Sequence, residues 1–183
     1  TWFYQPGSSP ILDLGVHGLS QITHLLGPVR RLSCFSGRSR PVRETTAGPY
    51  QVKRIDVAID DNSLLMLDFG DAVFAYLDST YCVPAALGPR LEIYGSDGTL
   101  AVSGAGADAR LQLFRSATRE WQTVDVPAAP PVRDLGTLHL VDCLREGGEL
   151  VLTGERGRHL VDVMARAPEA AREGRTLAIE TRF

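Results

Sequence analysis

A long run of short, alternating segments in the middle of the chain constrains the fold more than any other feature. Ile55, Val57 and Ile59 alternate with polar residues, which is the period-two pattern of a half-buried strand. Further strand-like segments follow, with short turns such as Gly70-Asp71 between them: 64–69, 73–80, 91–94, 99–102, 111–114 and 121–126. Because consecutive strands joined by tight turns pair antiparallel, the sequence predicts an antiparallel meander.

Helical patterns lie before and after these strands. Apolar residues at helical spacing predict a helix over 11–26 that ends at Gly27-Pro28. Residues 29–35 are typical of a strand, and 37–51 are expected to form a long loop. Near the end, the pattern predicts one helix from about Leu135 that stops at Gly147-Gly148, a second that Thr153 caps and that runs towards Gly174, and an edge strand over 177–180. Pro168 is expected to kink or break the second of these helices.

Helix, many strands and then helices is an α+β pattern. We expect an open, mostly antiparallel β-sheet with helices packed on one face. The other apolar face of such a sheet needs cover, and a second subunit is the expected partner.

Composition excludes several classes of protein. With 183 residues, 44% hydrophobic and 22% charged, the chain has the size and make-up of one globular domain. A net charge of −3 argues against a nucleic-acid surface. The cysteines, Cys34, Cys82 and Cys143, form no CxxC pair and are expected to be reduced core thiols. No apolar run approaches the length of a membrane span, and a cytoplasmic location is expected.

The first predicted helix carries an unusual polar stripe. Asp13, His17, Ser20 and His24 are spaced by four, three and four residues, which places them on one helical face. A carboxylate, two imidazoles and a hydroxyl are groups that bind and move protons, whereas a solvated face usually carries Lys, Arg and Glu. Gly15 lowers helix stability and indicates the close approach of a ligand or another backbone. A merely solvated stripe remains the alternative.

Two other chemistries compete with this interpretation. Asp13, His17 and His24 could offer metal ligands, but His24 lies two turns beyond His17 and no other His or Cys completes a set by spacing, so no metal is predicted. Residues 104–109 (GAGADA) match a relaxed dinucleotide fingerprint. The segment after them alternates like a strand, however, whereas a phosphate cradle requires a helix N-terminus.

Several further residues have ordinary explanations beside functional ones. Arg38, Arg40 and Arg43 could meet an anionic group, although loop arginines are usually solvated. Tyr4 and its neighbours Trp2 and Phe3 either wall a sugar pocket by stacking or belong to the core. Lys53 is expected to be solvated, and His139 and His159 are expected to have packing or surface roles.

Four segments, in order along nearly the whole chain, resemble the C-terminal domain of the Gfo/Idh/MocA oxidoreductases, the family of glucose–fructose oxidoreductase and inositol dehydrogenases. The run ILDLGVH at 11–17, followed by LLGP at 25–28, resembles the motif that opens this domain. Residues 91–100 (LEIYGSDGTL) resemble the central hairpin of the family. The last two helices of the family are matched by 141–147 (VDCLREG) and by 153–175.

The resemblance implies a fold and a set of roles. The fold would be that of a glyceraldehyde-3-phosphate-dehydrogenase-like C-terminal domain, with residues 1–183 forming a substrate-binding and oligomerisation domain. An N-terminal Rossmann domain, absent from this chain, would hold NAD or NADP and a catalytic lysine. His17 would be the general base for hydride transfer from a secondary alcohol of a sugar or polyol, and Asp13 would orient the imidazole or hold a substrate hydroxyl. Gly15, Ser20 and Tyr4 would contact substrate, and the sheet face would form a homodimer or homotetramer.

The sequence departs from the family pattern at three places. Ser8-Ser9-Pro10 replaces a Gly-rich stretch, Ser20 replaces a second Asp, and Pro168 interrupts a helix that normally continues. The family also includes NAD-dependent glycosidases and other variants, so the reaction itself can differ. A stand-alone, non-catalytic ligand-binding or dimerisation module remains the alternative, and this chain by itself is expected to be inactive.

Overall fold

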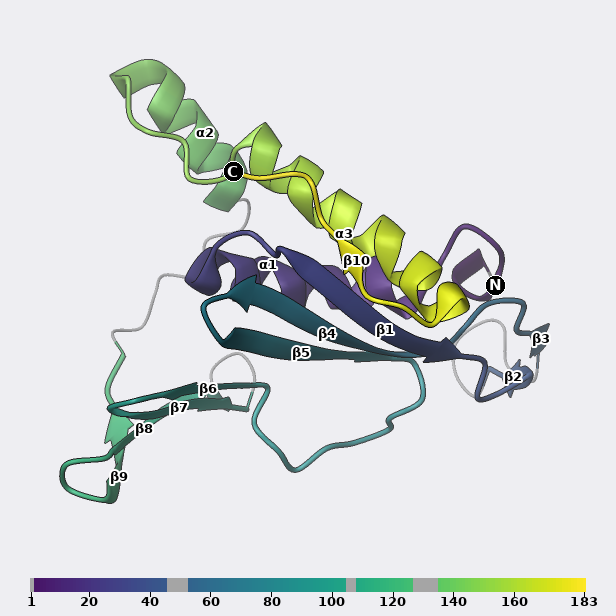
Figure 1. The fold of residues 1–183 in the computed structure, drawn as a ribbon, viewed down its shortest axis with the longest axis horizontal. Coiled ribbons are helices and arrows are strands. Elements are labelled where there is room, and N and C mark those ends of the chain that lie inside the picture. The colour runs from purple at the N-terminus through teal and green to yellow at the C-terminus, as the bar shows by residue number, and fades with distance from the viewer. Residues whose placement is uncertain (1, 46–52, 105–107, 127–134) are drawn as a thin grey trace. The chain divides into compact units, whose positions relative to one another are not determined.

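The protein is described by a computed structural model that covers residues 2–45, 53–104, 108–126 and 135–183. The chain divides into two compact units. The first unit comprises Thr1–Val83 and Asp142–Phe183, and the second comprises Pro84–Val141. Figure 1 shows the elements of both units, which are described separately below.

The first unit contains a four-stranded sheet in the order β10-β1-β4-β5. Its strands are β1 (Arg31–Gly37), β4 (Asn62–Gly70), β5 (Val73–Thr80) and β10 (Leu177–Ala178), and all neighbours pair antiparallel. The strand predicted over 73–80 has those bounds, and the edge strand predicted at the end of the chain is β10. The strands of the second unit are β6 (Leu91–Gly95), β7 (Gly98–Ser103), β8 (Arg110–Arg115) and β9 (Glu120–Val124). They form the later part of the predicted meander, whereas its earlier strands belong to two other sheets.

The helices of the first unit cover one face of its sheet. A short 3-10 turn, η1 (Trp2–Tyr4), precedes the π-helical turn η2 (Ile11–Gly15), which continues into α1 (Val16–Leu26). Helices α1 and α3 (Gly154–Glu173) contact each other, α3 packs on β1, and η2 and α1 pack on β5 (Figure 1). The α+β class with helices on one face is therefore confirmed. Helix α2 (Leu135–Glu146) crosses the boundary between the two units.

Strand periodicity explains which residues enter the core. Along β4, buried and less buried residues alternate, so that Leu65, Leu67 and Phe69 face the helices while Leu64 and Met66 face outwards. The buried strand residues meet one stripe from each helix and the tail after β10. The resulting core cluster includes Ile11, Leu19, Ile22, Leu32, Cys34, Val163, Met164, Ala167, Ala170, Leu177 and Ile179.

Two predicted features of this unit are wrong. Residues 37–51 were expected to form a loop, but β2 (Val42–Glu44) pairs with β3 (Arg54–Asp56) in a separate hairpin, and residues 46–52 lie outside the described part. Pro168 does not break α3, which runs through it to Gly174. The proline is exposed and its neighbours Val163 and Ala167 are fully buried, so packing on the sheet holds the helix together despite one lost backbone bond.

The cysteines are free, as expected, but only Cys34 lies in the core. Burial raises the pKa of its thiol to about 11, with a smaller contribution from the negative charge of Asp60. Cys82 and Cys143 are half-buried, so the expected core position is wrong for these two. Among the helices in the described ranges, none has both the length and the apolar character that crossing a membrane requires.

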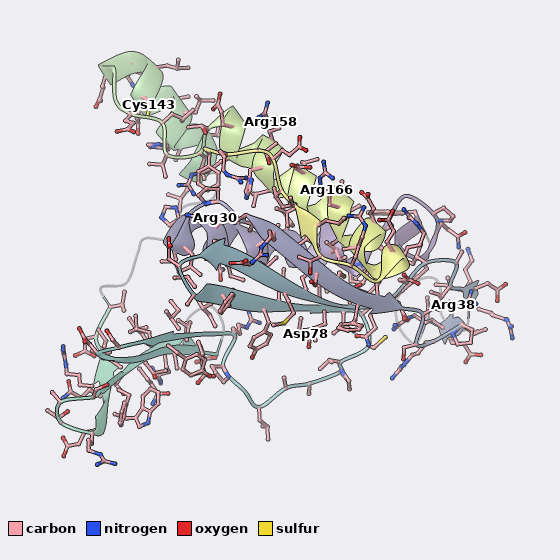
Figure 2. The ribbon with its side chains drawn as sticks, viewed as in Figure 1. Arg30, Arg38, Asp78, Cys143, Arg158 and Arg166 are labelled. Carbon is pink, nitrogen blue, oxygen red and sulfur yellow. The ribbon has the colours of Figure 1, made fainter. Side chains whose placement is uncertain are left out.

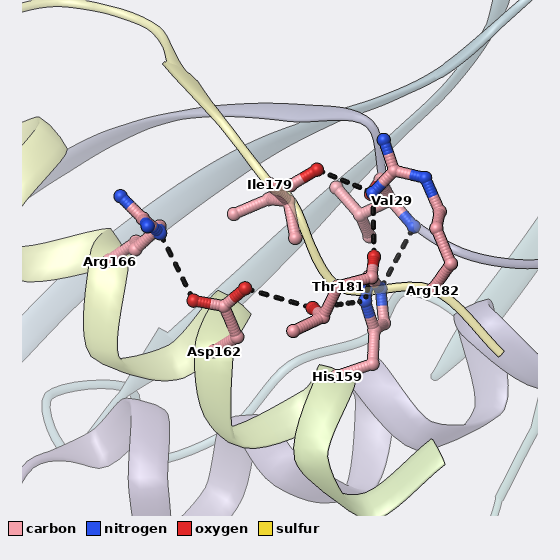
Figure 3. Close-up of polar contacts among 7 residues, drawn as sticks. All are labelled: Val29, His159, Asp162, Arg166, Ile179, Thr181 and Arg182. Atoms are coloured by element: carbon pink, nitrogen blue, oxygen red, sulfur yellow. Dashed lines mark hydrogen bonds and ion pairs between the residues drawn. The ribbon is translucent and has the colours of Figure 1, made fainter. Parts of the chain in front are cut away.

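His159 joins α3 to the chain terminus from inside the protein (Figure 3). The ring is fully buried, and its Nε2 accepts a hydrogen bond of 3.0 Å from the Val29 backbone N–H. Since Nε2 is the acceptor, the proton lies on Nδ1, which is 3.0 Å from the Thr181 hydroxyl. That hydroxyl donates to Asp162, which also pairs with Arg166. The expected packing role of His159 is confirmed.

Candidate functional site

The start of the first helix is not the regular helix that the sequence predicts. Residues Ile11–Gly15 form a π-turn, and Ser9 holds its beginning: the Ser9 hydroxyl accepts from the Leu12 N–H at 3.2 Å, and the Ser9 carbonyl accepts from the Asp13 N–H at 3.1 Å. A π-turn turns less per residue than an α-helix, so the ideal stripe from Asp13 to His17 is displaced. Such turns are frequent at functional sites.

Gly15 lets this turn lie directly against strand β5. A Cβ atom at Gly15 would stand 2.8 Å from the Ser79 Oγ, closer than two such atoms approach. The close approach predicted at Gly15 is therefore to a side chain of the sheet. Ser79 is itself buried, and within the described part of the chain its hydroxyl has no hydrogen-bond partner.

Asp13 is held by a tyrosine that sequence analysis did not single out. The Tyr81 hydroxyl, directly after β5, lies 3.2 Å from Asp13 Oδ2 and 3.3 Å from the Ser9 carbonyl oxygen. Burial and the negative charge of Asp13 raise the pKa of Tyr81 to about 12. The phenol therefore remains protonated at neutral pH and can donate to the carboxylate.

Aromatic rings pack around this phenol. The Tyr81 ring meets the edges of Phe3, at 6.5 Å between centroids, and of Tyr4, at 5.7 Å. Trp2 stacks on Phe3 at 3.9 Å and is 67% exposed, so this pair is not core. An exposed stacked pair next to a carboxylate is a surface on which a sugar ring could pack.

A buried ion pair supports the aromatic group. The Arg43 guanidinium lies 5.1 Å from the centre of the Tyr4 ring and 2.8 Å from the carboxylate of Asp61, which is fully buried. Although burial raises the pKa of Asp61, hydrogen bonds from Arg43 and from the Ser39 N–H hold it below its usual value. The solvated position expected of a loop arginine is therefore wrong for Arg43, whose side chain is 15% exposed and paired with Asp61.

The other two arginines of that group differ from Arg43. Arg38 donates to the Val57 carbonyl oxygen at 3.0 Å and is a structural residue. Arg40 is exposed and lines a cavity of about 630 Å³ together with Tyr4, Val42, Arg43, Glu44, Thr45 and Ile55.

His17 presents its ring to solvent. The residue is exposed, and among the described residues none forms a hydrogen bond or an ion pair with the imidazole. Ser20 is half-buried one turn later, and His24 is exposed further along α1. Within the described ranges, no three His, Cys, Asp or Glu side chains are grouped so as to hold a metal ion.

Two cavities of the first unit lie away from the polar residues of the helix start. The cavity beside Arg40 and a smaller one of about 210 Å³ over the sheet, near Arg31 and Thr176, are lined by neither Asp13 nor His17.

Sequence analysis found the helix-borne members of this group but missed Tyr81, Ser79 and Asp61. Asp61 lies in a segment predicted as a turn, and its burial leaves no trace in local periodicity. Tyr81 directly follows a predicted strand, so the sequence indicated only that it lies at one end of a sheet. Nothing in the sequence pairs it with Asp13, 68 residues away.

Comparison with known families gives one match that covers more than half of the chain. The GFO/IDH/MocA C-terminal domain matches residues 1–101, which include η2, α1 and β1 to β5.

Curated relatives extend this similarity over most of the chain. D-apiose dehydrogenase of Paraburkholderia graminis is 28% identical over 188 residues, covering 92% of this chain and 44% of that protein. The scyllo-inositol 2-dehydrogenase (NADP(+)) of Bacillus subtilis is 24% identical, covering 93% of this chain and 49% of its own length. The chain therefore spans about half the length of the curated relatives it matches.

Solved structures share the fold at lower identity. Levoglucosan dehydrogenase in complex with NADH and L-sorbose superimposes with a TM-score of 0.79 at 17% identity, covering 99% of this chain and 54% of that one. The transcriptional regulator Gal80p of Kluyveromyces lactis has a TM-score of 0.75 at 15% identity, covering 97% and 50%. At these identities the likeness concerns the fold alone.

Proposed function

Because the chain belongs to the GFO/IDH/MocA family, we propose that it is the substrate-facing domain of an NAD(P)-dependent oxidoreductase. The reaction is the oxidation of a secondary alcohol of a sugar or polyol, or the reduction of the matching ketone. The names of the curated relatives, a D-apiose dehydrogenase and a scyllo-inositol 2-dehydrogenase, support this substrate class.

The observation that carries the proposal is the arrangement of Asp13 and His17 at one helix start. Asp13 accepts a hydrogen bond from the Tyr81 hydroxyl, while the His17 ring is exposed and has no bond to another described residue. An unengaged imidazole is suited to accept a hydroxyl proton, and imidazole is the commonest general base near neutral pH. His17 therefore takes the proton of the substrate hydroxyl, and Asp13 orients the substrate or the imidazole.

The described residues fit the proton-handling half of such a reaction, and they offer no dinucleotide cradle. The Gly-rich segment at 104–109 leads into strand β8 rather than a helix, and residues 105–107 lie outside the described part. When bound, NAD or NADP accepts the hydride. We assign its binding mainly to an N-terminal Rossmann domain outside this chain.

Further residues complete the proposed substrate surface. Ser20, half-buried one turn after His17, can donate one hydrogen bond to a polyol hydroxyl. Trp2 and Phe3 form the exposed stacked pair that would contact the substrate. Tyr4 packs against Tyr81 and Arg43, so its contribution to substrate binding would be to support that surface. Gly15 contributes by letting the helix start approach β5. With free cysteines and a reaction that uses NAD(P), a cytoplasmic location remains our prediction.

The test uses the full-length protein that carries this chain. A panel of sugars and polyols is offered with NAD⁺ or NADP⁺, and reduced cofactor is followed by its absorbance. We expect turnover with at least one polyol and a loss of about 10²- to 10⁴-fold in kcat for His17→Ala. His24→Ala is the matched control, because His24 is an equally exposed histidine of the same helix, and it should retain the wild-type rate.

Two results would contradict this assignment. One is an inactive wild-type protein across the panel, and the other is a His17→Ala variant with the full rate. The 183-residue chain on its own should be inactive, so turnover by that fragment would refute the proposed division between two domains.

A non-catalytic module is the second candidate. The observation in its favour is that a transcriptional regulator, Gal80p, shares this fold. Binding of a sugar or a dinucleotide by the full-length protein without any turnover would select this alternative.

A further inference from the structure

Tyr81 lies between two features of the helix start that any reaction at this site would depend on. Its hydroxyl is 3.2 Å from Asp13 Oδ2 and 3.3 Å from the Ser9 carbonyl oxygen, which also accepts the Asp13 N–H at 3.1 Å. One phenol thus bridges the backbone that begins the π-turn and the carboxylate that the turn carries. We propose that Tyr81 is a positioning residue that fixes the orientation of the Asp13 carboxylate, an inference that rests on the function proposed above.

The chemistry of the pair favours a persistent bond. A phenol has one proton and two possible acceptors here, and the charged carboxylate is the stronger one. Because the pKa of Tyr81 is raised to about 12, the phenol keeps that proton over the whole range in which an enzyme works. One lone-pair site of Asp13 Oδ2 is thereby used, and Oδ1 keeps both of its sites for the substrate or for His17.

The phenol is held rigidly enough to serve this purpose. The Tyr81 backbone N–H donates to the Asp61 carbonyl oxygen at 2.9 Å, and the fully buried Asp61 side chain pairs with Arg43. Arg43 in turn lies over the Tyr4 ring, and Tyr4 packs edge-on against Tyr81. This closed circuit of contacts, which we call the Tyr81 frame (Tyr4, Arg43, Asp61 and Tyr81), fixes the ring from both the backbone and the side-chain end.

Orientation matters because Asp13 is only half-buried. A free aspartate on a helix surface samples several rotamers, and a reaction that needs one of them loses rate in proportion. Supporting residues that lock a reactive side chain are a general requirement for precise sites. Tyr4 of the frame lies in η1, Arg43 in β2, Asp61 between β3 and β4, and Tyr81 directly after β5. Strand-borne and strand-flanking residues therefore orient the carboxylate that the helix start carries.

The test removes one atom. Tyr81→Phe keeps the ring that packs on Phe3 and Tyr4 and deletes only the hydroxyl. In the full-length protein we expect kcat/KM for the best polyol to fall about 10- to 100-fold, since the lost bond is to a charged group, with most of the loss in kcat. Tyr94→Phe is the matched control: it also removes a phenol that donates to a carboxylate, Glu92 at 2.6 Å, but on the exposed hairpin of the second unit. It should keep the wild-type rate.

A double-substitution cycle tests whether Tyr81 acts through Asp13. Adding Tyr81→Phe to Asp13→Asn should produce no further loss of kcat/KM, because the group that Tyr81 orients is already changed. Urea unfolding reports the contact without turnover. In that cycle Asp13→Ala replaces Asp13→Asn, because the Asn amide oxygen would still accept from Tyr81, and Asp13→Ala and Tyr81→Phe should be non-additive.

The outcomes separate this inference from the proposed function. Wild-type kinetics of Tyr81→Phe, or losses that multiply independently with those of Asp13→Asn, would overturn the positioning role while His17→Ala still tests the reaction. If His17→Ala and Asp13→Asn both keep the full rate, the proposed function fails and this inference with it.

Discussion

Gly15 illustrates how much of the candidate site depends on one missing side chain. The turn that carries Asp13 rests on strand β5 with Ser79 directly beneath it, where an added Cβ would stand 2.8 Å from the hydroxyl oxygen. The next closest atom is the Ser79 Cβ at 3.4 Å, which is an acceptable contact. The obstacle to an alanine is therefore the Ser79 hydroxyl, which has no hydrogen bond to other described residues that would be lost with it.

We predict that Gly15→Ala destabilises the protein by about 1–3 kcal/mol, because the helix start must move away from β5. Ser79→Ala should remove most of that loss when the two substitutions are combined. Urea unfolding of the four proteins measures both effects. Gly157→Ala serves as the control, since Gly157 is an exposed glycine of α3 with no atom within 4 Å of an added Cβ, and it should gain about 0.5–1 kcal/mol. Equal stability of the Gly15→Ala and Gly157→Ala proteins would refute the argument.

At the scale of elements, the buried His159 side chain links α3 to the chain terminus and to the segment before β1. Its buried ring connects the Val29 N–H, just before β1, to Thr181, just after β10 (Figure 3). Burial lowers the pKa of His159, the positive charge of Arg182 lowers it further, and Thr181 and Asp162 act in the opposite direction. A protonated ring would also turn Nε2 into a donor that faces the Val29 donor, so the folded state favours the neutral form.

This arrangement predicts a loss of stability on mild acidification. The unfolded chain binds a proton at His159 below the ordinary histidine pKa of about 6.5, whereas the folded chain does not until the pH reaches its lower folded pKa, so stability falls with pH across that interval. The free energy of unfolding in urea at about pH 7.5 and about pH 5 measures the effect. His159→Gln, whose amide oxygen can still accept from Val29, should show a smaller difference between the two pH values.

The pH range of the measurement distinguishes His159 from the carboxylates, which change protonation in stronger acid. The pKa values of Asp61 and Asp162 are lowered in the folded state, so their stabilisation is lost only in stronger acid, below about pH 4. His24→Gln, which changes an exposed histidine, should leave the pH dependence as in the wild type. An unchanged pH dependence in His159→Gln would show that the buried ring is not the responsible group.

For the whole molecule, the face of the first sheet opposite its helices is the feature that contacts within the first unit do not explain. Large apolar side chains lie side by side on it because of the strand register, in which Phe35 pairs with Leu64, and Met66 with Tyr76. Phe35, Phe74 and Tyr76 are 75%, 66% and 65% exposed. Figure 2 shows Asp78 of β5 on the same side of the sheet, away from α3. Contiguous exposed apolar surface of this kind marks an interaction site.

We therefore predict that the full-length protein is a homodimer or homotetramer through this face. Phe74→Glu combined with Tyr76→Glu should reduce the mass in analytical ultracentrifugation to that of a monomer, because two buried carboxylates without partners disfavour the interface. Leu87→Glu, on a fully exposed apolar residue outside this sheet, should keep the mass of the wild type. A monomeric wild-type protein would rule the interface out.

Local pattern alone determined much of this protein. The period of two in β4 and β5, the Thr153 cap of α3 and the glycines that end α2 and α3 act over a few residues, so their consequences can be predicted without a fold. The same holds for Asp13 and His17, which one helix start carries together whatever surrounds it. Their role in a reaction remains a proposal on that basis.

Contacts between distant segments were decided only by the tertiary structure. Tyr81 meets Asp13 across 68 residues because η2 packs on β5, and Arg43 reaches Asp61 because the β2–β3 hairpin folds back beside the start of β4. Tertiary packing also decided that α3 continues through Pro168, because the neighbouring helix residues are buried in the core. Periodicity states which side of an element is apolar, but sheet register and packing determine which polar groups that element brings together, and the orientation of the candidate site depends on those groups.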